Sequence, residues 1–438
     1  MAVPGKISFW AAVLMSINII VGAGYLLSTS KMAALAGSAS FLYWIFGGLL
    51  VFPVIWCIAQ ASQVFPGEGG FYNYCSKGIN PFFGFLAQWV YLVGYMGTAM
   101  VFVMALKDTL VNKAGLTMVA DYPTLYITVT ILFFTLLNML PITTVSRIQS
   151  IATVFKLLPM LMVIALIPFY FSTTVTYAGA SVGSLAESLP VLFFAFWGFE
   201  ACVSIAHMLK GGPTAVARVM LTGFFLIAVT YMLFHFGLIH IMGADALGAR
   251  GAAVFPQYLG FSPQVTSIIG GMIVGAIVLS FMNCVFGVLL GNMTNFYQIA
   301  KSKLIIGSGA ITKTTKQDRP IAAGIILAVV LWSMLMLVDK ISIGVAITNM
   351  GVSSAFVLTL VALFLHNLKR RNIPQLLVTL LGFVSCGILI FYSWCSISPD
   401  AMERVVYCIP LFVGVVIGIV LNACTPKQKT WWKKAFGL

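Results

Sequence analysis

The chain has 438 residues, of which 61% are hydrophobic and 8% are charged, and its mean hydropathy is +1.05. Soluble proteins are about 25% charged, so too few polar side chains exist here to cover a water-soluble globule, which excludes a cytosolic enzyme, a nucleic-acid-binding protein and a disordered chain. The 24 Lys and Arg against 10 Asp and Glu give a net charge of +14, and these basic residues lie between long apolar runs, as expected of loops facing an anionic membrane surface.

Apolar runs long enough to cross a membrane predict about twelve helices, since a spanning helix needs about 20 apolar residues. The runs are continuously apolar rather than alternating, which excludes a β-barrel and predicts an all-α integral membrane protein. The first run is too long for a signal peptide, so we expect an uncleaved helix. The predicted spans are 8–36, 39–62, 82–106, 122–140, 145–170, 188–208, 214–242, 263–297, 320–338, 342–366, 375–397 and 404–424.

The distribution of basic residues predicts the orientation of these helices. With the N-terminus in the cytoplasm, 18 of the 24 Lys and Arg fall on the cytoplasmic side. Cytoplasmic loops carry such an excess of positive charge. We therefore expect a multi-pass protein of the cytoplasmic (inner) cell membrane with both termini inside and a cytoplasmic tail over residues 425–438.

The sequence carries no pattern that indicates catalysis or a metal site. The eight cysteines form no CxxC pair, the four histidines are scattered, and no HExxH, GxSxG or phosphate loop is present. We therefore predict no metal and no cofactor, and a membrane-embedded enzyme has no support. An ion or solute channel remains an alternative, although few polar residues are available within the spans to line a water-filled path.

Two of the predicted spans are interrupted by glycine. The first contains Gly22-Ala23-Gly24, and the sixth contains Gly198 beside Glu200, an acid inside a membrane span and therefore a functional candidate. Interruptions about 175 residues apart, in the first and sixth spans, are typical of a transporter built from two inverted repeats. This predicts one transmembrane domain over 1–424, with repeats at about 8–170 and 188–366 and extra helices at about 375–424.

An interrupted membrane helix offers specific binding chemistry. Irregular backbone survives in a membrane only where it is buried in protein or lines a cavity. The exposed N–H groups at one helix end attract a carboxylate, and the exposed C=O groups at the other attract an ammonium. A pair of such helices could thus bind a free α-amino acid at both of its charged groups.

At these residues the sequence resembles the amino acid–polyamine–organocation (APC) superfamily of permeases. The resemblance covers about residues 8–365 and rests on four motifs in order. They are Gly22-Ala23-Gly24, the loop at 65–72 (Phe-Pro-Gly-Glu-Gly-Gly-Phe-Tyr), the helix-3 residues Gly84-Phe85 and Trp89-Val90-Tyr91, and the stretch 194–200 (Phe-Ala-Phe-Trp-Gly-Phe-Glu).

The resemblance implies roles for individual residues. The amides of Gly22, Ala23 and Gly24 would bind the substrate carboxylate, and the carbonyls of Ile20, Phe194 and Trp197 would bind its ammonium. Phe194 would be an aromatic gate, and Tyr91 with Glu200 an inner-gate pair. Phe196 and Phe286 would line the pocket, and Tyr95 is expected to be a buried tyrosine of its wall.

Lys156 in the fifth span is the candidate coupling residue. One interpretation is a lysine whose ammonium reaches back to the membrane interface. The other is a buried lysine beside the broken first helix, which resembles the helix-5 lysine that some APC permeases carry where sodium-coupled relatives bind a cation. Burial disfavours the charged form of a lysine, so this residue could carry a proton, and the second interpretation predicts sodium independence.

Together these features predict a secondary active transporter of amino acids that works by alternating access. Proton-coupled symport and amino acid exchange both need one central site with two gates, so both remain open. The substrate is an amino acid of unassigned side chain, and a cationic amino acid or amine antiporter is an alternative because of Glu200. The sequence predicts no partner other than this substrate, the bilayer and, under symport, protons; it does not indicate an oligomeric state.

Overall fold

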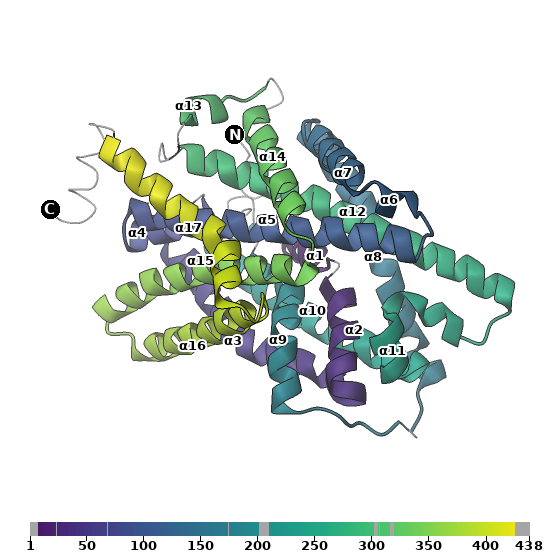
Figure 1. Ribbon diagram of the computed structural model, residues 1–438. Coiled ribbons are helices and arrows are strands. Elements are labelled where there is room, and N and C mark those ends of the chain that lie inside the picture. The colour runs from purple at the N-terminus through teal and green to yellow at the C-terminus, as the bar shows by residue number, and fades with distance from the viewer. Residues whose placement is uncertain are drawn as a thin grey trace.

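The computed structural model describes residues 8–22, 24–67, 69–173, 175–200, 210–301, 305, 307–315 and 319–424. These residues form helices and connecting loops, without a strand among them (Figure 1). In chain order, the elements are α1 (Phe9–Ile20), α2 (Gly24–Ala36), η1 (Gly37–Leu42), α3 (Tyr43–Val64), α4 (Gly70–Gly78), α5 (Pro81–Asn112), α6 (Met118–Asp121), α7 (Pro123–Asn138), α8 (Ile142–Tyr170), α9 (Val182–Phe196), α10 (Gly212–Met242), α11 (Ala244–Arg250), η3 (Ala252–Tyr258), α12 (Pro263–Lys301), α13 (Ser308–Ile311), α14 (Ile321–Leu337), α15 (Ile341–Lys369), α16 (Ile373–Cys395) and α17 (Ala401–Cys424).

The long helices lie where the apolar runs predict them. Within the described residues, seven helical segments are long and apolar enough to cross a membrane, and α7, α9 and α14 are shorter apolar helices. The prediction of an all-α membrane protein is confirmed. The interruption of the first span falls between Ile20 and Gly24, at the glycine pair that predicted it, and the sixth span is described only as far as residue 200.

The long helix α5 lies at the centre of the molecule, against α15 and α12 (Figure 1). Glycines allow α5 and α15 to approach closely. A Cβ atom on Gly351 of α15 would lie 2.6 Å from the Cα of Gly94 on α5 and 2.5 Å from the carbonyl oxygen of Val90. Small residues at such crossings let membrane helices pack backbone to backbone. The two helices thus form a closely packed pair, and α15 also packs against α9.

Buried polar side chains join α3 and η1 to α10. Trp44 donates its indole N–H to Nδ1 of His235 at 3.2 Å, and Nε2 of His235 lies 3.2 Å from the Ser40 hydroxyl, which donates to the carbonyl of Gly37. Because an indole only donates, Nδ1 must accept, and the proton of the neutral ring lies on Nε2. His235 is fully buried, so this chain of hydrogen bonds satisfies a polar group that would otherwise be costly to bury.

Candidate functional site

The first interruption separates α1 from α2. The carbonyl of Ile20, the last residue of α1, accepts a hydrogen bond from the N–H of Gly22 at 2.7 Å and another from the hydroxyl of Tyr231 on α10 at 3.1 Å. A carbonyl oxygen has two lone pairs, and both are used here. An ammonium that binds the Ile20 carbonyl must therefore displace one of these donors. Ala23 lies outside the described residues.

The second interruption ends α9. Phe196 is its last residue, and Trp197 adopts an extended conformation with ψ 147°. Gly198 follows with φ +113°, a left-handed conformation that glycine adopts without steric cost. The helix therefore stops at Trp197, the residue whose carbonyl is predicted to bind the ammonium. Residues 201–209, which follow it, lie outside the described part of the chain.

The two interruptions meet in space. A Cβ atom on Gly24, at the start of α2, would lie 2.9 Å from the Cα of Ala195 and 3.2 Å from the ring of Phe194, at the end of α9. Further along, the Ser28 hydroxyl lies 2.7 Å from the carbonyl of Gly24 and 2.6 Å from that of Val191. Figure 1 shows α2 and α9 side by side. The structure thus brings the predicted carboxylate-binding segment against the predicted gate residue.

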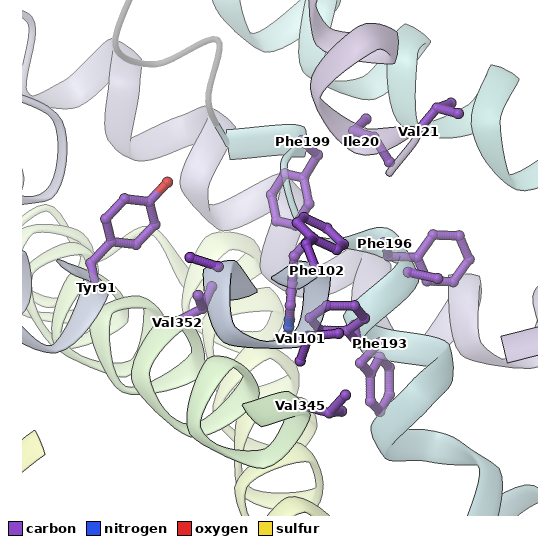
Figure 2. Packing of buried hydrophobic residues seen from close by; sticks show 14 of the residues in the cluster. Ile20, Val21, Tyr91, Val101, Phe102, Phe193, Phe196, Phe199, Val345 and Val352 are labelled. Atoms are coloured by element: carbon purple, nitrogen blue, oxygen red, sulfur yellow. The ribbon is translucent and has the colours of Figure 1, made fainter. Parts of the chain in front are cut away.

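Aromatic side chains surround the meeting point. The Cζ atom of Phe102 on α5 lies 3.0 Å from the position that a Cβ atom on Gly22 would occupy. The Phe102 ring also packs edge-to-face on Phe194, with ring centroids 5.9 Å apart. Phe196 instead faces Trp44, at 5.4 Å. Figure 2 shows Phe102 between Phe196 on one side and Tyr91, farther away, on the other. Sequence reasoning missed Phe102 because one phenylalanine in an apolar span carries no distinguishing signal.

Glu200 is buried and hydrogen-bonded to α5. Its Oε1 accepts from the hydroxyl of Tyr95 at 2.6 Å and from that of Tyr91 at 3.2 Å, and its Oε2 accepts from the backbone N–H of Gly198 at 3.0 Å. The structure therefore brings together Tyr91 and Glu200, the two residues predicted as an inner-gate pair. Tyr95, expected only as a wall residue, makes the shorter of the two tyrosine bonds.

Lys156 on α8 is buried beside the first interruption. Its side chain is 2% exposed, which does not fit an ammonium that reaches back to the interface. Helix α8 packs against α12, on which the Sγ of Cys284 lies 3.4 Å from the Cβ position of Gly22. The burial agrees with the second interpretation of Lys156, and its role as the coupling residue stays a prediction.

Phe286 contacts α7. It stacks on Phe134 with centroids 6.2 Å apart, and its carbonyl accepts from the Asn138 side chain at 3.3 Å. The α12 residue that the structure places against Gly22 is Cys284, two positions earlier. The pocket-lining role of Phe286 stays a prediction, and Cys284 is a contact of the break that sequence reasoning missed.

The described residues do not form a metal site here. In the part of the chain that the structure describes, no group of three His, Cys, Asp or Glu side chains could hold a metal ion. The groups that meet here are instead two helix interruptions, a buried acid, a buried lysine and aromatic rings. Such an arrangement suits a small zwitterion with a partly apolar body.

The sequence pattern of the amino acid permease family matches residues 7–421. The chain belongs to this family. As an amino acid permease, it is a multi-pass membrane protein that transports amino acids and is not an enzyme. The membership confirms the resemblance to the APC superfamily that the four motifs indicate.

Three curated relatives illustrate the activities found among similar permeases. The serine/threonine exchanger SteT of Bacillus subtilis (strain 168) is 23% identical over 307 residues, which cover 67% of each chain. The arginine/agmatine antiporter of Chlamydia pneumoniae is 29% identical over 242 residues, 50% of this chain and 49% of the relative. The glutamate/serine transporter AimA of Bacillus subtilis (strain 168) is 21% identical over 255 residues, 52% and 46% of the two chains. The last two alignments thus span about half of each relative.

Proposed function

We propose that this permease exchanges amino acids across the cytoplasmic membrane by alternating access, independently of sodium. The observation that carries the proposal is the contact between the two interrupted helices, where the Cβ position of Gly24 lies 2.9 Å from Ala195. Movement of either helix end must disturb the other. One binding site formed by both can therefore be linked to the opening of a gate on either side.

In this proposal the substrate binds by its backbone charges. The amides of Gly22, Ala23 and Gly24 take the carboxylate, and the carbonyls of Ile20, Phe194 and Trp197 take the ammonium. Helix ends favour such charges through the partial charges of their unpaired backbone groups. Tyr231 leaves the Ile20 carbonyl when the ammonium arrives, since the hydroxyl occupies that acceptor in the structure.

Exchange is favoured over proton-coupled symport by the relatives. Two of them are named as an exchanger and an antiporter. Symport remains the second candidate, because the buried Lys156 could pass a proton between states. In either case its ammonium takes the place of a coupling cation beside the broken first helix, which is why we propose that transport needs no sodium.

A small neutral amino acid is the preferred substrate in this proposal. The Glu200 carboxylate already accepts from Tyr91, Tyr95 and the Gly198 N–H, so a cationic side chain would have to displace these donors to pair with it. Serine appears in the names of two of the relatives. The alternative of a cationic substrate is supported by the similarity to the arginine/agmatine antiporter.

Counterflow into proteoliposomes tests the function. The vesicles are preloaded with unlabelled L-serine, L-threonine, L-glutamate, L-arginine or agmatine, and uptake of the same labelled compound is followed with and without a sodium gradient, at two pH values. We expect uptake of L-serine only into preloaded vesicles, equal with and without sodium. A requirement for sodium would exclude the proposal that the Lys156 ammonium replaces a coupling cation. Uptake into empty vesicles that is driven by a proton gradient would favour symport. A single-channel current would favour a channel.

The orientation with both termini in the cytoplasm also belongs to this proposal. It rests on the excess of Lys and Arg in one set of loops. Labelling of a single cysteine placed in the 425–438 tail, in sealed right-side-out vesicles, would be blocked until the membrane is permeabilised. Immediate labelling would reverse the orientation.

A further inference from the structure

Asn349 of α15 is hydrogen-bonded to α9 and to the residue that follows it. Its Oδ1 accepts from the indole N–H of Trp197 at 2.6 Å, and its Nδ2 donates to the carbonyl of Pro190 at 2.8 Å. Asn349 is fully buried. One amide side chain therefore contacts two residues seven positions apart, one inside α9 and one at its end.

The Trp197 side chain makes this double contact possible. Its ring stacks on that of Phe193, one turn earlier, with centroids 6.3 Å apart. The indole thus extends back along α9, which brings its N–H to the same amide as the Pro190 carbonyl. The ring also contacts Phe356, likewise from α15, edge-to-face with centroids 5.4 Å apart.

The partners of Asn349 demand one donor and one acceptor. An indole N–H only donates and a prolyl carbonyl only accepts, which also fixes which amide atom is oxygen and which is nitrogen. Aspartate offers only acceptors when ionised, and leucine, of similar size, offers neither. The fit is therefore specific to an amide, at a buried position where unpaired polar groups are costly.

Trp197 is also the residue at which α9 ends. Its backbone leaves the helix with ψ 147°, and the left-handed Gly198 follows. A side chain fixed against α15 restricts the rotation of this residue, and hence the direction of its carbonyl. The orientation of the second interruption is thus set from α15 as well as from α9 itself.

We propose that Asn349 is a positioning residue of the substrate site, which holds Trp197 so that its carbonyl faces the substrate ammonium. This inference rests on the proposed function. The Oδ1 and Nδ2 atoms of Asn349 are held by Trp197 and Pro190, so Asn349 acts through Trp197 and not by contact with substrate. Its loss therefore weakens the binding of every substrate by the same factor, because all amino acids share the ammonium.

The variants Asn349→Leu and Trp197→Phe remove the same hydrogen bond from its two sides. Thr348→Val is the matched control, because Thr348 is a neighbouring, fully buried residue of α15 whose hydroxyl accepts from Thr98 of α5 at 3.2 Å. We expect the KM of L-serine counterflow to rise about tenfold in either variant with a maximal rate within about twofold of wild type. The KM of the double variant should be no higher than that of the more impaired single variant, since the effects of two substitutions that remove the same hydrogen bond are not additive. The control should stay within about twofold.

Substrate ranking separates positioning from direct contact. L-serine and L-threonine should lose affinity by the same factor in Asn349→Leu. An unchanged KM, additive effects of the two substitutions, or a changed ranking of the two substrates would each overturn the proposal. Should Asn349→Leu not fold, Trp197→Phe carries the same expectation on KM and ranking.

A spectroscopic measurement tests the contact without transport. The protein is labelled with 5-fluorotryptophan at its nine tryptophans. The fluorine resonance that disappears in Trp197→Phe is the one that belongs to Trp197. We expect that resonance to move in Asn349→Leu and to stay in place in Thr348→Val; no movement in Asn349→Leu would refute the contact. If the wild-type protein shows no amino acid counterflow, the proposed function fails, while this resonance still decides whether Asn349 holds Trp197.

Discussion

The Tyr95 hydroxyl donates to Oε1 of Glu200 at 2.6 Å, whereas Tyr91, one turn earlier on α5, reaches the same oxygen at 3.2 Å. Both hydroxyls come from α5, and the acid follows the interruption at the end of α9. The pair of tyrosines therefore ties the second interruption to the central helix. Of the two, the shorter bond belongs to the tyrosine that sequence motifs did not single out.

Tyr95→Phe should reduce L-serine counterflow more than Tyr91→Phe does. A hydrogen bond to a charged group contributes about 1.5–3 kcal/mol, so we expect about a tenfold or greater loss of rate for Tyr95→Phe and a smaller loss for Tyr91→Phe. Tyr126→Phe is the control, since its hydroxyl donates to the backbone of Val103, away from Glu200. Wild-type rates in Tyr95→Phe would show that this bond does not matter for transport.

Gly24→Ala should abolish transport. The added Cβ would lie 2.9 Å from the Cα of Ala195, and backbone atoms cannot move aside as a flexible side chain can. Gly48→Ala on α3 is the control, because its added Cβ would meet only the ring of Phe224 at 3.9 Å, and alanine favours a helix by about 1 kcal/mol over glycine. We expect counterflow below about a tenth of wild type in the first variant and no loss in the second. Full activity of Gly24→Ala would separate the two interruptions functionally.

Lys156→Met should remove transport without loss of stability. Burying a charged ammonium costs free energy that an apolar side chain of similar size does not incur, so the midpoint of thermal unfolding should stay or rise while counterflow falls to background. Lys301→Met serves as the control, because Lys301 is exposed and lies over the ring of Tyr297. Retained transport in Lys156→Met would end the assignment of Lys156 to coupling.

Trp44→Phe should destabilise the protein through His235. The variant leaves Nδ1 of a fully buried histidine without its donor, and an unsatisfied buried polar group costs about 1–3 kcal/mol. Trp56→Phe is the comparison, because it removes a bond of the same length, to the Gln375 side chain, at a position that is not enclosed by protein. We expect the thermal midpoint to fall clearly only in Trp44→Phe; equal midpoints would mean that the Trp44 bond contributes nothing.

The sequence predicted the helices and the interruptions better than the contacts between them. Apolar runs locate membrane helices because the bilayer requires them, and Gly22-Ala23-Gly24 located the first interruption because adjacent small residues weaken a helix. Lys156 stood out as a charge in an apolar span, and the structure buries it.

The remaining site residues carry no local signal. Phe102, Cys284 and Asn349 lie in ordinary apolar spans, and what distinguishes them is the packing of α5, α12 and α15 around the two interruptions. Tyr95 differs from a wall tyrosine only through a partner that is 105 positions away in the chain. Such contacts depend on tertiary structure, which periodicity and motif spacing do not encode.

The most direct test of the central claim is the stoichiometry of exchange. Proteoliposomes loaded with tritiated L-serine are diluted into buffer with or without carbon-14-labelled L-threonine, in the absence of sodium, and efflux and influx are counted together. We predict one L-serine leaving for each L-threonine entering, with almost no efflux into buffer lacking an amino acid. Efflux that proceeds equally without external amino acid would contradict exchange through a single site formed by the two interrupted helices.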